Sequence, residues 1–103
     1  MSRVLKTFRA EEDLHEIWAY IAEDNPTAAD KLIGEFDRAF RLLADHPKMG
    51  RERSAILPGI RSLPVGNYVI FFVEEAEGVK VVRVLHGARN LESLEFNPQA
   101  EGP

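Results

Sequence analysis

Two helical stripes joined by a very short turn constrain this chain more than any other feature of its sequence. The first apolar stripe lies within residues 10–21 and consists of Leu14, Ile17, Trp18 and Ile21, with Trp18 expected in the core. The second consists of Ala29, Leu32, Ile33, Phe36, Phe40 and Leu43. Both recur at spacings of three and four, as on one face of an α-helix. Between them, Asn25 is a favourable N-cap and Pro26 suits the first helical position. The two helices therefore form an antiparallel hairpin that needs a flat surface to cover it.

The second half of the chain supplies such a surface. Residues 60–65, 68–73 and 79–85 read as strands separated by turns at Gly66-Asn67 and residues 75–78. The middle run is apolar on both faces and is predicted to be central, whereas Pro64 indicates an edge position or a strand end. Residues 3–8 form a further short strand, whose place in the sheet stays open. We predict a two-layer α+β domain in the order strand–helix–helix–strand–strand–strand, with the helical hairpin packed on a mainly antiparallel sheet.

Length and composition limit the classes of protein that remain. The 103 residues fit one domain, expected over residues 1–96, followed by a disordered C-terminal tail over residues 97–103. The chain has no cysteine and no apolar run long enough to cross a bilayer, which favours a cytoplasmic protein without disulfides. Its three histidines have no metal-ligand spacing, and no glycine-rich phosphate loop follows a strand. We predict no metal, no cofactor, no catalytic residue and no membrane partner.

The charge is acidic overall but unevenly distributed. A formal net charge of −4 argues against direct binding of nucleic acid, because phosphate recognition usually needs an excess of basic residues. Residues 47–90, however, carry seven Lys or Arg against four Asp or Glu. The seven are Lys48, Arg51, Arg53, Arg61, Lys80, Arg83 and Arg89. A local basic surface is therefore expected on an acidic protein.

The most informative group of polar residues stands where the last predicted strand runs into Gly87. Arg83, His86 and Arg89 at the end of a sheet can bind an anion or a partner protein. The structural alternative is that Arg83 pairs with an acid on a neighbouring element and His86 caps the strand. Farther along, three apolar residues at nearly helical spacing either cover the sheet edge or present an apolar patch to a partner, namely Leu91, Leu94 and Phe96.

Six short motifs, in order along residues 3–96, resemble the ParE/RelE toxin superfamily of type II toxin–antitoxin systems. They are Ala10-x-x-Asp13-Leu14-x-x-Ile17-x-x-Tyr20-Ile21, Asn25-Pro26-x-Ala28-Ala29, His46-Pro47-x-Met49-Gly50, Gly59-Ile60-Arg61, Tyr68-Val69-Ile70-Phe71-Phe72 and Arg83-Val84-Leu85-His86-Gly87-Ala88-Arg89. The resemblance implies a toxin that is neutralised by a cognate antitoxin. ParE-like members inhibit DNA gyrase by binding, whereas RelE-like members cleave messenger RNA in the ribosome.

The RelE-like site typically has an arginine directly after the strand tyrosine, a second in a Gly-x-Arg turn, and a tyrosine in the C-terminal tail. Here Val69 stands at the first position, Arg89 matches the second, and Tyr68 is the last tyrosine of the chain. The resemblance therefore favours a ParE-like toxin, not an enzyme, with a ParD-like antitoxin and DNA gyrase as partners. The residues expected to bind the target or partner are Arg61, Arg83, His86, Arg89, Leu91, Leu94 and Phe96. The alternatives are a ribosome-dependent ribonuclease of the RelE type, using the same arginines and His86, and a non-toxic relative that only binds its antitoxin.

Overall fold

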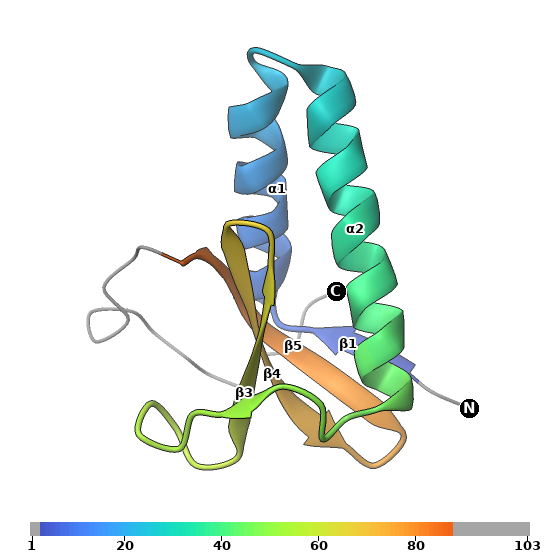
Figure 1. The fold of residues 1–103 in the computed structure, drawn as a ribbon, viewed down its shortest axis with the longest axis vertical. Coiled ribbons are helices and arrows are strands. Elements are labelled where there is room, and N and C mark those ends of the chain that lie inside the picture. The colour runs from blue at the N-terminus through green and yellow to red at the C-terminus, as the bar shows by residue number, and fades with distance from the viewer. Residues whose placement is uncertain (1–2, 88–103) are drawn as a thin grey trace.

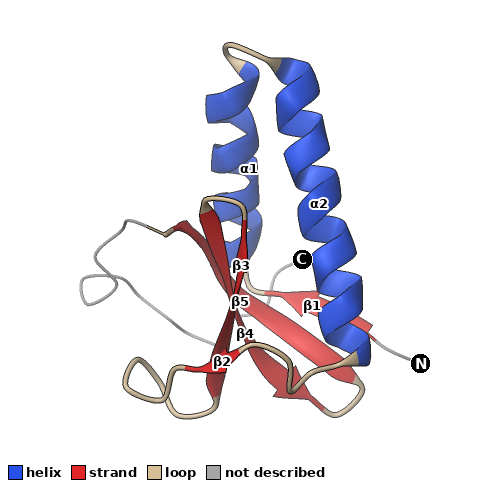
Figure 2. Cartoon of the chain, viewed as in Figure 1, coloured by secondary structure: helices blue, strands red, loops and turns tan. Residues whose placement is uncertain are grey.

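The computed structural model describes residues 3–87, in which a helical hairpin lies against one face of a five-stranded sheet (Figure 1). The elements are, in chain order, β1 (Arg3–Lys6), α1 (Phe8–Ala22), α2 (Pro26–Asp45), β2 (Arg51–Glu52), β3 (Ile60–Val65), β4 (Tyr68–Glu75) and β5 (Gly78–His86). This is the predicted α+β fold of two layers. Figure 2 shows that the end of the hairpin that carries the α1–α2 turn projects beyond the strands.

The strand order is β1-β5-β4-β3-β2, with β4 in the middle as predicted. The hairpins β3–β4 and β4–β5 form the predicted antiparallel meander. Pro64 lies opposite Val69 of β4 and beyond the short β2, so no strand within residues 3–87 pairs with its other side. The sequence left the place of β1 open. It pairs in parallel with β5, from Arg3 opposite Gly78 to Lys6 opposite Val81, and makes the sheet mixed.

The structure differs from the sequence prediction in where the first strand ends and in an additional short strand, β2. The first strand ends at Lys6, and Phe8 begins α1 instead of lying in the strand. The reason is Thr7, whose hydroxyl accepts the Ala10 N–H at 3.0 Å as the N-cap and donates to the Val82 carbonyl at 2.7 Å. The sequence also does not predict β2, because two exposed residues leave no periodicity to detect.

The main core lies between the hairpin and the sheet. The α2 stripe supplies Phe36, Phe40 and Leu43, which are buried as predicted and pack with β4 and β5 residues such as Ile70 and Val81. A second cluster occupies the other face of the sheet and consists of Ile60, Phe71, Val82 and Leu85.

Trp18 is not part of that core, contrary to the sequence prediction. Its side chain is 38% exposed, and its Nε1 donates a hydrogen bond to Asp30 of α2 at 2.8 Å. The C-terminal part of α1 projects away from the sheet (Figure 1), so a residue there finds only α2 to pack against. The apolar stripe of α1 is therefore buried unevenly, with Leu14 and Ile17 in contact with the core.

Several predictions fall on residues that the structure does not describe. Arg89, Leu91, Leu94, Phe96 and the tail over residues 97–103 lie outside residues 3–87. Within the described part of the chain, neither helix combines the length and the apolar character needed to span a membrane.

Candidate functional site

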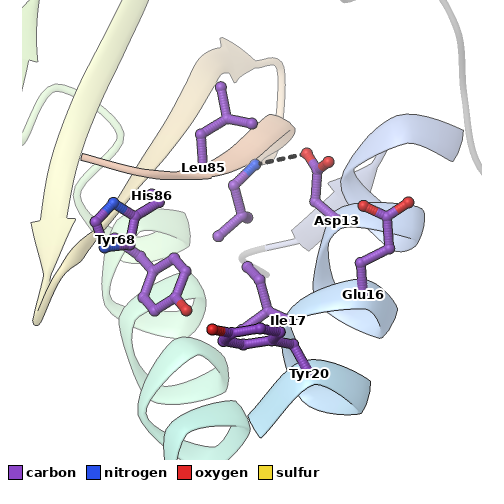
Figure 3. A pocket seen from close by; sticks show the side chains of 8 residues that line it. Asp13, Glu16, Ile17, Tyr20, Tyr68, Leu85 and His86 are labelled. Carbon is purple, nitrogen blue, oxygen red and sulfur yellow. Dashed lines mark hydrogen bonds between the residues drawn. The ribbon is translucent and has the colours of Figure 1, made fainter. Parts of the chain in front are cut away.

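Arg83, one of the predicted binding residues, lies inside the protein. Its side chain is 1% exposed, and its Nε and Nη2 donate to the two carboxylate oxygens of Asp13 at 2.7 and 2.9 Å. The Asp13 side chain is itself only 4% exposed, and its Oδ2 also accepts the Val84 N–H at 3.0 Å (Figure 3). This is the structural alternative that the sequence left open. Arg83 joins β5 to α1 and presents no charge on the surface.

Arg61 and His86 lie at separate places on the sheet. Arg61 donates to the Gly50 carbonyl at 3.3 Å and to Glu52 at 3.4 Å, which holds it against β2. His86 is exposed at the end of β5, and its ring stands edge-on to Tyr68 with the centroids 5.4 Å apart. In the sheet register Arg61 faces Phe72 and His86 faces Tyr68. Four residues along β4 correspond to about 13 Å, so the three predicted residues that the structure describes do not converge.

The expected basic surface is smaller than the sequence suggests. Lys80 is 5% exposed and lies 3.7 Å from the Glu75 carboxylate, and Arg83 is internal. Arg53 lies over the Phe71 ring at 5.8 Å and helps to cover the second apolar cluster. Among the basic residues of 47–87, those that are exposed are therefore Lys48, shortly before β2, and Arg51, within it.

A cleft of about 540 Å³ lies between α1 and the end of β5. Its lining comes from three elements and consists of Asp13, Glu16, Ile17, Tyr20, Tyr68, Val84, Leu85 and His86. In Figure 3, Ile17 and Tyr20 of α1 face Tyr68 and His86 across the cleft. Sequence reasoning found only His86 of this set. The one further signal was Tyr20, a large residue off the apolar stripe, which is 77% exposed.

The cleft begins where α1 replaces a strand along the edge of β5. β1 covers that edge only as far as Val81, whose carbonyl accepts the Thr7 N–H at 3.0 Å. The Thr7 hydroxyl then binds the Val82 carbonyl, and Asp13 binds the Val84 N–H. Beyond Val84, no strand within residues 3–87 pairs with this edge of β5, and the cleft lies beside it.

The described residues show no arrangement suited to a metal. Among residues 3–87, no group of three or more His, Asp or Glu side chains is placed to hold a metal ion. What the site offers is an apolar cleft with aromatic walls, one strand edge and an exposed carboxylate, Glu16. Such a surface is suited to recognising a polypeptide.

The family model that matches this chain is described as the ParE toxin of the type II toxin–antitoxin system parDE, and it covers residues 4–91. The chain is 29% identical to Toxin ParE3 of Caulobacter vibrioides, over 88% of this chain and 92% of that protein. It is 34% identical to Toxin ParE1 of Mycobacterium tuberculosis, over 82% and 89% of the two chains. Toxin RelE2 of Caulobacter vibrioides is 35% identical, over 86% and 99%.

A solved structure described as a chromosomal ParDE TA system from P. aeruginosa has the same fold. Its TM-score is 0.69 at 21% sequence identity, covering 84% of this chain and 96% of that chain. The family match spans most of the sequence, and the relatives are matched over nearly their full length. This chain therefore belongs to the ParE toxin family of type II toxin–antitoxin systems.

Proposed function

We propose that this protein inhibits DNA gyrase by binding it, and that a ParD-like antitoxin neutralises it. The observation that carries the proposal is the match to the ParE toxin family over residues 4–91. Relatives named ParE in two bacteria, matched over most of their length, support the same branch of the superfamily. The solved relative of the same fold belongs to a ParDE system, which supports an antitoxin as the partner.

The placement of the charged side chains supports binding in preference to cleavage of RNA. Cleavage needs a general acid and a general base within hydrogen-bonding reach of the same phosphate. Arg83 donates hydrogen bonds to Asp13, and Arg61 donates to Glu52 and to the Gly50 carbonyl. His86 is separated from Arg61 along the sheet, and Val69 occupies the position where the RelE-like pattern has an arginine. The relative named RelE2 makes ribosome-dependent cleavage the competing function to test.

The test compares both targets with the same purified protein. We expect induction of the gene to arrest growth, and the protein to block supercoiling of relaxed plasmid by gyrase and ATP. One equivalent of the ParD-like protein encoded beside it should restore supercoiling. In parallel, messenger RNA on translating ribosomes should stay intact.

Two outcomes would contradict the proposal. One outcome is normal supercoiling together with cleavage of the messenger RNA. If the Arg89→Ala variant no longer cleaved the RNA, the protein would be a ribonuclease of the RelE type. Normal growth and normal supercoiling, with tight binding of the antitoxin, would identify a non-toxic relative.

A further inference from the structure

We propose that the cleft beside β5 binds an extended segment of the antitoxin, which pairs with the β5 edge and carries an apolar and a basic side chain two positions apart. The inference rests on the proposed function, because it takes the antitoxin as the partner. It assigns that partner to one place on the surface and to one backbone conformation.

The backbone of β5 gives the first reason. The Val84 N–H points away from β4, since it donates to Asp13 at 3.0 Å. The N–H and C=O of one strand residue point to the same side, so the Val84 carbonyl also faces the cleft. No residue within 3–87 donates a hydrogen bond to it outside the β4 pairing. A strand edge that ends in an open groove is a common docking site for an extended peptide.

The alternation continues to the end of the strand. The Gly87 N–H turns back to the Asn67 carbonyl at 2.9 Å, so His86 has the same orientation as Val84. Two residues of β5 therefore direct their backbones toward the cleft side. The proposed pairing needs only the Val84 carbonyl, and a partner segment of about three or four residues is long enough to pass along this stretch of β5.

The lining of the cleft gives the second reason. Ile17, Tyr20, Tyr68 and Leu85 supply apolar surface around a volume of about 540 Å³, enough for a large aliphatic or aromatic side chain. Tyr20 is 77% exposed, the highest value among the large hydrophobic residues of the described chain. Exposed aromatic residues beside a cavity are typical of the positions that dominate binding energy in protein interfaces.

The acidic residues of α1 give the third reason, and they indicate that the second side chain of the partner segment is basic. On α1, Glu11 lies 3.6 Å from Lys6, and Glu12 lies 2.9 Å from Arg9. Glu16 lines the cleft, is exposed, and makes no ion pair or hydrogen bond with another residue of the described range 3–87. A lysine or arginine of the partner would complete this pairing along the helix. Because side chains on one face of a strand recur every second residue, the basic residue should stand two positions from the apolar one.

The test measures binding of the full-length protein to the ParD-like product of the adjacent gene by titration calorimetry. Tyr20→Ala is expected to weaken binding by about thirtyfold or more, as for an aromatic hot spot. Glu16→Lys should weaken it by about tenfold, with a smaller effect at high salt because exposed charges are screened. The matched controls are Phe8→Ala and Glu23→Lys, which alter exposed residues of the same helix region outside the cleft lining and should change affinity by less than about threefold.

A second measurement tests the strand pairing itself. Synthetic peptides covering the antitoxin, each with one N-methylated amide, should include one position whose methylation weakens binding about tenfold, because it removes the donor to Val84. Uniform effects along the peptide, or none, would overturn the pairing. If Tyr20→Ala and Glu16→Lys bind like the controls, the site is wrong while the proposed function stands. If the wild-type protein binds no antitoxin and leaves gyrase active, the proposed function fails as well.

Discussion

Replacing Asp13 by alanine should destabilise the protein far more than replacing any exposed carboxylate on the same helix. Three hydrogen bonds end on this carboxylate, two from Arg83 at 2.7 and 2.9 Å and one from the Val84 N–H at 3.0 Å. The side chains of Arg83 and Asp13 are 1% and 4% exposed, so water cannot replace the lost acceptor. Removing one partner of a buried ion pair costs about 3–5 kcal/mol. That is a large share of the roughly 5–15 kcal/mol by which a domain is stable.

The matched control is Glu12→Ala. Glu12 also forms an ion pair on α1, with Arg9 at 2.9 Å, but the two side chains are 50% and 59% exposed. An exposed pair contributes less than about 1 kcal/mol, because both charges are hydrated and screened. Asp13→Asn should fall between the two, since the amide oxygen can still accept the Val84 N–H but carries no charge.

Urea unfolding measures the difference directly. With a slope of about 1–3 kcal/mol per molar for a domain of this size, the Asp13→Ala midpoint should fall by about 1 M or more. Far-UV circular dichroism and the fluorescence of the single tryptophan, Trp18, provide two independent signals. If Asp13→Ala and Glu12→Ala lowered the free energy of unfolding equally, by less than about 1 kcal/mol, the argument from burial would be refuted.

Two further substitutions test the sheet and the core. Gly78→Ala should cost about 1–3 kcal/mol, because Gly78 has a φ of 155° and an added Cβ would clash with the backbone of Arg3; an unchanged melting temperature would contradict this. Phe36→Ala should cost about 3–5 kcal/mol, since the ring is fully buried between α2 and the sheet. Leu42→Ala, at a residue 46% exposed on the same helix, should stay within about 1 kcal/mol, and equal effects of the two would show that α2 does not pack as described.

The parts of the fold that could be predicted are those in which neighbouring residues carry the whole signal. α2 is the clearest case, because its N-cap, first residue and apolar stripe all indicate the same helix. Asn25 does accept the Ala28 N–H at 3.0 Å, Pro26 opens the helix, and Phe36 lies fully buried in the stripe. The meander is similar, since each strand is bounded by turn residues and pairs with the next one along the chain.

The parts that could not be predicted depend on contacts between distant residues. β1 pairs with β5, and the Thr7 hydroxyl reaches the Val82 carbonyl across 75 residues. Asp13 and Arg83 are 70 residues apart. The sequence leaves open that Arg83 pairs with an acid on a neighbouring element, but nothing in the sequence identifies Asp13 as that acid. The cleft was missed for the same reason, because its walls come from α1, β4 and β5.

The residues that stabilise this protein and the residues of its candidate binding site are neighbours on α1, because β1 is short. Because β1 ends at Lys6, α1 begins beside the β5 edge, and Asp13 can reach the Val84 N–H. From Asp13 to Tyr20 the helix advances about 10 Å, at about 1.5 Å per residue. Over that distance α1 leaves the edge that it covered at its start, and the cleft opens. Within two turns of one helix, Asp13 thus holds the fold together while Glu16 and Tyr20 are available to a partner, so their substitutions should affect stability and binding separately.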